Sequence, residues 1–216
     1  MSPVVTAVEP RKSGVAAVTL DGGDLPLLLP LETVVMHRVR AGAEFEDADW
    51  ATLTGEGQRL LAVREALTFL ARRHRTEREL RTALATKIED PAVIDHAVER
   101  MRTLGYLDDA AWARNYVGSG RARDRGRALI RMELQQRGVA DPIAREAIEA
   151  HDETAAALEA ARKRARSLRD LEEPKRSRRL HDFLRRRGFG DSVAREASRQ
   201  ALAELGGGPA TGLDAE

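Results

Sequence analysis

The sequence predicts a mainly α-helical protein, with three tandem three-helix repeats forming an elongated, curved stack behind a small N-terminal β unit. Two observations predict the repeats. The stretches RGVADPIAREA at 137–147 and RGFGDSVAREA at 187–197 share seven of eleven residues, fifty residues apart. The apolar spacing that precedes both stretches also occurs fifty residues earlier, as Leu80 and Leu84. Such a period is typical of helical repeat proteins, in which neighbouring units share their cores.

Residues 1–57 are expected to form a β-hairpin-like extension. Their three apolar runs are strand-like and lie at Val4–Val8, Gly14–Leu20 and Leu25–Leu29. The turn-forming residues Asp21-Gly-Gly-Asp24 separate the second run from the third. The extension is acidic, with four Lys or Arg residues against nine Asp or Glu, so it differs from the rest of the chain in charge as well as in pattern.

The first helical repeat is expected at residues 58–107. Its first helix is predicted by an amphipathic stripe of Leu60, Val63, Leu67 and Leu70. A capping box from Thr76 to Glu79 predicts where the second helix begins, and Asp90 followed by proline predicts the start of the third. Aligning Asp90 with Asp141 leaves this copy one residue shorter than the next.

The second and third repeats are expected at residues 108–151 and 152–205. In both, the repeated stretch is interpreted as the end of one helix followed by the start of another. Gly138 and Gly188 can adopt the left-handed backbone that ends a helix, and Asp141 and Asp191 are expected to cap the helix that follows. The repeated stretch therefore sets the helix boundaries in each repeat.

The composition indicates the cellular compartment in which the protein is expected. No cysteine is present, which excludes disulfides and thiolate sites and fits a reducing environment. The longest apolar run, Leu25–Leu31, is broken by proline, and the N-terminus lacks the order of a secretory signal. We expect a soluble, cytoplasmic, monomeric protein with no membrane contact, whose tail at 206–216 is disordered.

The sequence also lacks the patterns of an active site. Its five histidines stand singly and are interpreted as surface or helix-cap residues, so no metal site is expected. The glycine-rich run Gly118–Gly126 lacks the Gly-Lys-Ser/Thr ending of a phosphate-binding loop. The adjacent acids Asp108 and Asp109 fit a helix start. We therefore predict no catalytic residue, no metal, no cofactor and no enzymatic activity.

The third repeat carries a basic helix face. Residues 158–205 contain fourteen Lys or Arg residues against eight Asp or Glu. With Leu180 on the buried side of a helical wheel, the outer half carries Asp182 together with five bases, Lys175, Arg178, Arg179, Arg185 and Arg186. A second cluster, in the second repeat, comprises Arg121, Arg123, Arg125 and Arg127. Together the clusters predict a surface that binds an acidic or polyanionic partner.

Two simpler explanations stay open for these arginines. A chain with 32 Arg and 4 Lys can owe its arginine content to codon bias. Any single arginine can also belong to a solvated helix face. The occurrence of two clusters in adjoining repeats favours a binding surface, because neither simpler explanation requires clustering.

Motifs in the second repeat carry a family resemblance. The segment Leu104–Ala113, which reads LGYLDDAAWA, is followed by Tyr116-Val117, by Ile130-x-x-Glu-Leu134 and by Arg137-Gly138. This combination resembles the signature of the RecX family, modulators of the bacterial RecA recombinase. Similar motifs occur at Glu79-Leu-Arg81 in the first repeat and at Leu184-x-x-Arg-Gly-Phe189 in the third. The segments Val5–Glu9 and Leu31–Val34 resemble the β extension that some members carry, so the resemblance covers roughly residues 4–205.

The resemblance implies a protein without enzymatic activity that binds along the RecA filament on DNA and usually suppresses its ATP hydrolysis and strand exchange. A stack of three repeats suits this role, because it can contact several filament subunits at once. The alternative is a helical module that binds single-stranded nucleic acid directly, which the arginines favour and the scarcity of aromatic residues disfavours. A purely structural adaptor would leave the basic clusters without a role.

Overall fold

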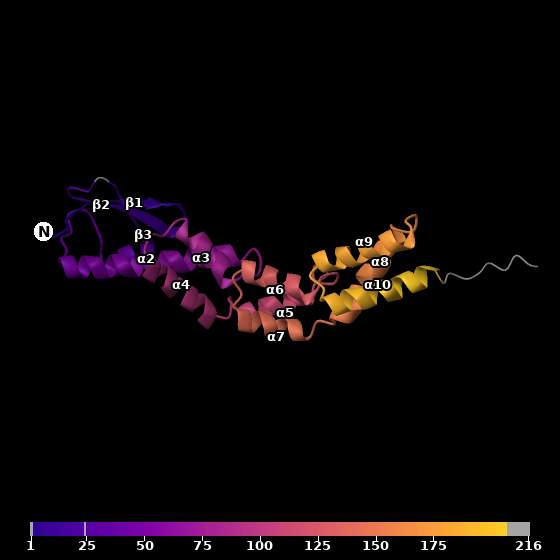
Figure 1. Cartoon of the computed structure of the whole chain (residues 1–216). Coiled ribbons are helices and arrows are strands. Elements are labelled where there is room, and N and C mark those ends of the chain that lie inside the picture. The colour runs from indigo at the N-terminus through magenta and orange to yellow at the C-terminus, as the bar shows by residue number, and fades with distance from the viewer. Residues whose placement is uncertain (1, 24, 207–216) are drawn as a thin grey trace, which may run out of the picture. The chain divides into compact units, whose positions relative to one another are not determined.

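The computed structural model of the chain describes residues 2–23 and 25–206, and Figure 1 shows the order of the helices and strands. The tail expected to be disordered, 206–216, lies outside the described residues except for Gly206. The chain divides into two compact units, Met1–Asp108 and Asp109–Glu216. In the part of the chain that the structure describes, no helix has both the length and the apolar character needed to cross a bilayer.

Three antiparallel strands form the N-terminal sheet in the order β1 (Val5–Arg11), β2 (Val15–Leu20) and β3 (Leu27–Pro30). A 3-10 turn, η1 (Lys12–Gly14), joins the first two strands, and a short helix, α1 (Leu31–Met36), follows the third. The sheet expected from the sequence is confirmed. The predicted turn between β2 and β3 includes Asp24, which lies outside the described residues.

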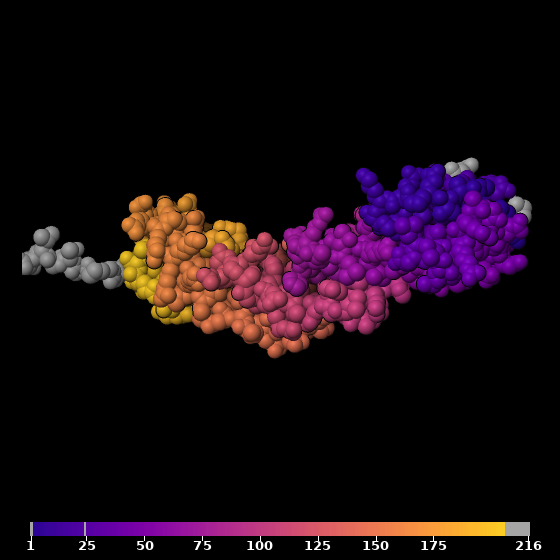
Figure 2. Space-filling model, turned by 180° about the vertical axis from the view of Figure 1, so that it is seen from behind, coloured from indigo at the N-terminus to yellow at the C-terminus, as the bar shows by residue number. Residues whose placement is uncertain are grey.

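The helix α2 (Asp47–Leu70) serves both the sheet and the first repeat. Its first half packs on the sheet so closely that a Cβ atom on Gly57 would lie 2.7 Å from Cδ2 of Leu29. Its second half contributes Leu70 and two alanines to the core of the first repeat. The helix therefore begins well before Leu60 and runs through the expected boundary after residue 57, and the sheet and α2 form one continuous body in Figure 2. A division of function at residue 57 stays a prediction.

The first repeat is completed by α3 (Glu77–Ala85) and α4 (Pro91–Thr103). The predicted capping box is present. The Glu79 N–H donates to the Thr76 hydroxyl oxygen at 3.3 Å, and the Thr76 N–H donates to the Glu79 carboxylate at 3.4 Å. The Asp90 carboxylate caps α4 by accepting a first-turn backbone N–H at 2.8 Å. Local side-chain chemistry thus sets both helix starts, as the sequence indicated.

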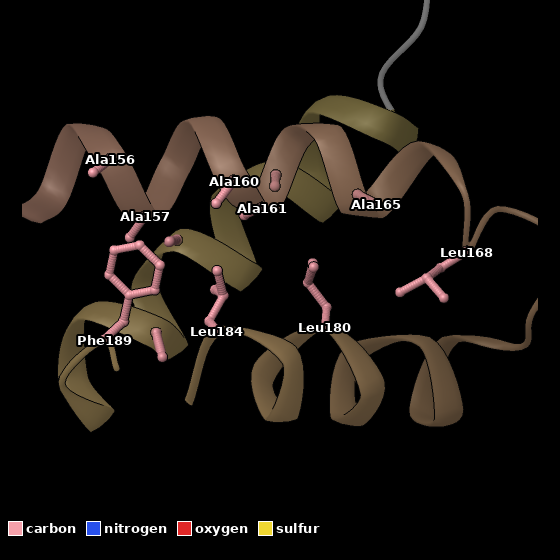
Figure 3. Packing of buried hydrophobic residues seen from close by; sticks show 12 residues of the cluster. Ala156, Ala157, Ala160, Ala161, Ala165, Leu168, Leu180, Leu184 and Phe189 are labelled. Carbon is pink, nitrogen blue, oxygen red and sulfur yellow. The ribbon is translucent and has the colours of Figure 1, made fainter. Parts of the chain in front are cut away.

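The second repeat comprises α5 (Asp109–Val117), α6 (Arg127–Gln136) and α7 (Asp141–Glu149), and the third comprises α8 (Glu153–Arg166), α9 (Glu173–Arg186) and α10 (Asp191–Gly206). The core of the third repeat pairs small residues with large ones. Five buried alanines of α8 pack with Leu180, Leu184 and Phe189, which are almost fully buried (Figure 3). The alanines let the helices approach closely enough for a few large side chains to fill the core.

The third helix of each repeat begins in the same fifty-residue register. In each helix, a backbone N–H donates to the carbonyl oxygen four residues before it. The donors are Ile94, Ala144 and Ala194, and the corresponding acceptors are Asp90, Ala140 and Gly190. Asp90 is therefore the counterpart of Ala140, and the one-residue deletion expected from aligning Asp90 with Asp141 was wrong. Asp141 is not the cap of α7 either. Its carboxylate instead accepts from Arg131 at 2.6 Å and from Gln135 at 2.8 Å.

Backbone contacts join the second repeat to the third. The N–H of Gly126 donates to the carbonyl oxygen of Arg187 at 2.8 Å, and the N–H of Ala128 donates to that of Gly188 at 3.3 Å. The Arg187 guanidinium also forms an ion pair with Asp124. Because these bonds involve the start of α6 and the end of α9, they hold the two repeats together within one unit.

Candidate functional site

The exposed side of α9 is the basic face that the sequence predicted. Leu180 and Leu184 are fully buried in the repeat core. Five cations lie on the solvent side of the same helix, namely Lys175, Arg178, Arg179, Arg185 and Arg186. The buried and exposed sides of the helical wheel are therefore confirmed, whereas the binding role of the face stays a prediction.

Three of these cations have no carboxylate partner in the part of the chain that the structure describes. Arg178, Arg179 and Arg186 form no ion pair within residues 2–23 and 25–206. Lys175 lies 3.6 Å from the carboxylate of Glu172, an exposed pair of the kind that contributes little to stability. The Arg185 guanidinium donates to the carbonyl oxygen of Phe189 at 2.7 Å and so helps to close the end of α9. The charge of the first three arginines is available to an anionic partner.

The cluster in the second repeat is divided between exposed and internally bonded arginines. Arg121 and Arg123 are exposed and form no ion pair in the described part of the chain. Arg125 is half-buried, pairs with Glu133 and donates to the Tyr116 hydroxyl oxygen at 3.0 Å. Burial, reinforced by the hydrogen bond to Glu133, raises the pKa of Tyr116. Arg125 thus takes part in a network that supports α5 and α6.

Arg127 and His151 link the second repeat to the start of the third. The Arg127 guanidinium donates to the carbonyl oxygen of His151 at 3.0 Å, and the Arg127 N–H donates to the Glu153 carboxylate at 3.0 Å. The His151 ring is buried, with Nε2 2.8 Å from the carbonyl oxygen of Arg125. The expectation that every histidine lies on the surface or at a helix cap was therefore wrong for His151. Its partner is brought to it only by the tertiary fold.

Two surface grooves carry basic residues that the sequence prediction omitted. One lies between α9 and α10 and has a volume of about 950 Å³, and the other lies between α6 and α7 and has a volume of about 290 Å³. The omitted arginines are Arg131 and Arg145 in the second repeat and Arg176, Arg195 and Arg199 in the third. The fifty-residue period could have found Arg145 and Arg195, because it relates the two directly.

One aspartate in each of these two repeats bonds two basic side chains that line the groove. In the second repeat, hydrogen bonds from Arg131 and Arg145 hold the pKa of Asp141 below its ordinary value. In the third, hydrogen bonds from Arg195 and then from a histidine of α9 lower the pKa of Asp191 in the same way. Because Asp141 bonds two guanidinium groups, it compensates only part of the positive charge around it.

These side chains can bind anions, and they are positioned by rigid helices. Within residues 2–23 and 25–206, no group of three or more His, Cys, Asp or Glu side chains is placed to hold a metal ion. The fold and the basic surfaces together define a helical repeat protein with an exposed basic helix face.

The chain belongs to the RecX family. It matches the first, second and third three-helix domains of RecX over residues 62–101, 108–148 and 151–197. Regulatory protein RecX of Prosthecochloris aestuarii is 34% identical over 142 residues, which cover 65% of this chain and 93% of that protein. Regulatory protein RecX of Deinococcus radiodurans is 35% identical over 155 residues, covering 70% of this chain and 73% of that protein. A crystal structure of regulatory protein RecX has the same fold, with a TM-score of 0.67 and 23% identity over 92% of this chain and 99% of that one.

Proposed function

We propose that the protein modulates a RecA-type recombinase by binding along the recombinase–DNA filament and suppressing ATP hydrolysis and strand exchange. In this proposal it acts as a cytoplasmic monomer, without a cofactor or enzymatic activity of its own. The observation that carries the proposal is the α9 face, where Arg178, Arg179 and Arg186 have no ion-pair partner in the described part of the chain. Membership of the RecX family indicates the partner.

The arrangement of the second and third repeats supports binding at more than one point. Backbone hydrogen bonds at Gly126 and Ala128 hold the repeats together, so the exposed bases of both are presented by one unit. A filament repeats its surface from subunit to subunit, and a ligand that contacts two equivalent places gains affinity from the second contact. Uncompensated arginines also speed association with an anionic surface.

The proposal is tested by measuring ATP hydrolysis by the cognate recombinase on single-stranded DNA, with and without this protein. We expect hydrolysis to fall as the protein is added. The double variant Arg179→Glu and Arg186→Glu should inhibit about tenfold less potently, because it reverses two exposed charges without changing the core. Arg185 stays unchanged in this variant, since it bonds the Phe189 carbonyl oxygen.

The matched control reverses two charges elsewhere, through Arg72→Glu and Arg73→Glu just after α2. Both arginines are exposed and form no ion pair in the described residues. This control should inhibit like the unchanged protein. An unchanged protein that leaves hydrolysis unaffected, or two variants that lose potency equally, would contradict the proposal.

Direct binding of single-stranded nucleic acid is the second candidate function. The exposed Arg121 and Arg123 favour it. The aromatic residues Trp112 and Tyr116 give this candidate little support. Their rings stack on each other, with 5.4 Å between the centroids, and pack against the repeat core instead of facing a nucleic-acid base. Binding to a thymidine oligonucleotide across a salt series separates the candidates, since phosphate contacts give a steep salt dependence. Equal losses on bare DNA and on the filament in the α9 variant would favour the nucleic-acid module.

A further inference from the structure

The groove of the second repeat recurs in the third at the same six positions, fifty residues on. The α6–α7 groove is lined by Arg127, Ala128, Arg131, Arg145, Ile148 and Glu149. The corresponding residues of the α9–α10 groove are Ser177, Arg178, His181, Arg195, Ser198 and Arg199. Both repeats therefore build one surface feature from equivalent positions, and the third repeat extends it toward Leu202 and Ala203.

The rims of both grooves are basic. The six shared positions hold three arginines and one glutamate in the second repeat, and three arginines and a histidine in the third. Asp191 and Glu173 also line the larger groove, where they pair with Arg195 and Arg176, and the exposed Arg199 pairs with Glu196 of the same helix. Arg178 forms no ion pair within the described residues. The larger groove thus offers positive charge to a ligand.

The grooves combine these charges with apolar surface. Ile148 contributes apolar surface to the smaller groove, and Leu202 and Ala203 contribute it to the larger one. Ser198 takes the place of Ile148 in the third repeat, and its hydroxyl is buried without a hydrogen-bond partner in the described chain. An unpartnered buried hydroxyl is costly, so a ligand that brings an acceptor to it would gain a hydrogen bond that the chain itself does not supply.

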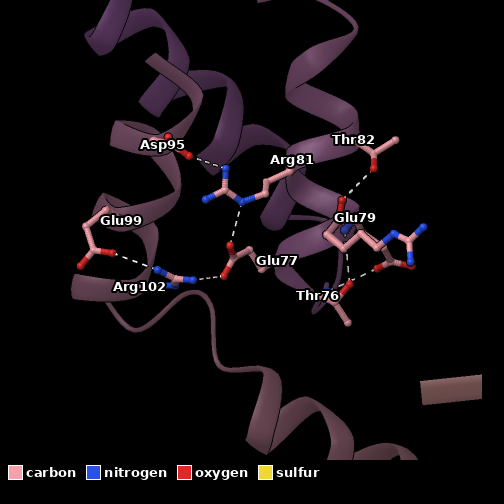
Figure 4. A network of polar contacts seen from close by, with 9 residues as sticks. Thr76, Glu77, Glu79, Arg81, Thr82, Asp95, Glu99 and Arg102 are labelled. Carbon is pink, nitrogen blue, oxygen red and sulfur yellow. Dashed lines mark hydrogen bonds and ion pairs between the residues drawn. The ribbon is translucent and has the colours of Figure 1, made fainter. Parts of the chain in front are cut away.

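The first repeat instead fills the equivalent surface with its own ion pairs. The Arg81 guanidinium donates to Glu77 at 2.7 Å and to Asp95 at 2.5 Å, while Arg102 pairs with both Glu77 and Glu99 (Figure 4). The three acids Glu77, Asp95 and Glu99 lie one hundred residues before Ser177, Arg195 and Arg199, so they occupy the equivalent positions of the first repeat. The difference between the repeats is therefore one of balance: these positions of the first repeat hold more acidic than basic side chains. The grooves of the other two repeats are lined by more basic than acidic ones, although several of those arginines also form ion pairs.

We propose that the two grooves bind acidic, amphipathic segments of a protein partner, with the α9–α10 groove as the principal site. Carboxylates of the segment pair with Arg178 and, in competition with the exposed Glu196, with Arg199 at the rim. An acceptor reaches Ser198, and apolar side chains cover Leu202 and Ala203. The apolar part of the groove favours a protein segment, because a phosphodiester backbone has no apolar side chains to place there. This inference deepens the proposed function by naming the chemistry of the partner surface, and its test does not depend on the recombinase.

The test measures how tightly the full chain binds a labelled helical peptide with glutamates on one face and leucines on the other. The variant Arg178→Glu and Arg199→Glu should bind the peptide at least about tenfold more weakly, because both rim charges become repulsive. The control variant Lys163→Glu and Arg166→Glu makes the same change of charge on exposed positions of α8, outside the groove, and should bind within about twofold of the unchanged protein. If circular dichroism shows that the groove variant is unfolded, the neutral variant Arg178→Gln and Arg199→Gln replaces it, with the same expected direction.

A thymidine oligonucleotide provides the second arm. The groove variant should lose less affinity for the oligonucleotide than for the peptide. Equal losses would show that the groove recognises phosphates, and peptide binding like that of the unchanged protein would show that the groove is not used; either result overturns the inference. If the unchanged protein leaves recombinase ATP hydrolysis unaffected while the peptide results hold, the proposed function fails and the groove assignment stands.

Discussion

A Cβ atom on Gly126 would lie 2.2 Å from both the carbonyl carbon and the carbonyl oxygen of Gly188. Backbones can approach this closely because neither residue carries a side chain. Gly188 also has a φ of 82°, in the left-handed region that ends α9. The glycine that the repeated stretch predicted as a helix stop is therefore also part of the contact between the second and third repeats.

The variant Gly126→Ala should break this contact. The clash is with backbone atoms, so relief requires the repeats to move apart, and we expect a loss of about 3 kcal/mol of stability in the second unit. Chemical denaturation measures that loss. Hydrogen exchange should show faster exchange at the Ala128 amide, which donates to the Gly188 carbonyl oxygen. The control is Gly120→Ala, where an added Cβ meets nothing within 4 Å. Equal stability of the two variants would show that the contact does not hold the repeats together.

The variant Gly57→Ala should loosen the sheet from α2. Its Cβ would lie 2.7 Å from Cδ2 of Leu29 and 3.2 Å from Cδ of Pro30, so the gain in helix propensity is offset by crowding. Gly55→Ala lies on the same helix with nothing within 4 Å of the added Cβ, and it should stabilise the protein by up to about 1 kcal/mol. Thermal unfolding of both variants should place Gly57→Ala below the unchanged protein and Gly55→Ala above it. The reverse order would contradict the packing of α2 on the sheet.

Periodic and local signals predicted most of the fold. Leu80, Leu84 and their counterparts mark the buried side of each second helix, and the capping box at Thr76 fixes a helix start through side chains three residues apart. The sequence did not predict the start of α2, because the first half of this helix packs on the sheet partly through Gly57. A glycine has no side chain and therefore does not contribute to the apolar periodicity by which a helix is recognised. The role of Asp141 was missed because an aspartate before proline fits both the cap position and the first helical position.

The candidate site was predictable only where it depends on helix geometry. A wheel places Arg178, Arg179 and Arg186 in solvent because their helix has one buried side. The same reasoning could not show that Arg125 is bonded to Glu133, since that partner lies on another element and the pair forms only in the folded repeat. The grooves were missed for a related reason, because each is lined by two helices whose spacing no single segment of sequence encodes.

The Glu77 carboxylate should make the stability of the first repeat depend on pH. Burial opposes its ionised form, but hydrogen bonds from Arg81 and Arg102 outweigh burial and lower its pKa below the ordinary value of 4.5. A lowered pKa in the folded state gives stability that is present above pH 4.5 and is lost as pH falls through the folded value. Glu77→Gln should therefore cost about 1 kcal/mol at pH 7, since solvent screens part of the interaction.

The cost of Glu77→Gln should shrink below pH 4.5, which urea denaturation at a series of pH values can measure. Glu99→Gln is the matched control, because Glu99 pairs with Arg102 alone in the same network and is more exposed. It should change stability by less than about 0.5 kcal/mol at every pH. A cost for Glu77→Gln that is constant from pH 7 to pH 3 would show that the interaction does not depend on the ionised carboxylate.

Ser198 offers a test of stability that is separate from binding. Its hydroxyl is buried without a hydrogen-bond partner in the described chain, and Ser198→Ala removes that group while improving helix propensity in α10. We expect the variant to gain about 1 kcal/mol in free energy of unfolding. The exposed Ser192 lies near the start of the same helix, and Ser192→Ala should change the stability by less than about 0.5 kcal/mol. Denaturant unfolding of the full chain would measure both free-energy changes. A loss of stability in Ser198→Ala would mean that the hydroxyl is hydrogen-bonded in solution, for example to a buried water, and that no unsatisfied group is held there for a partner.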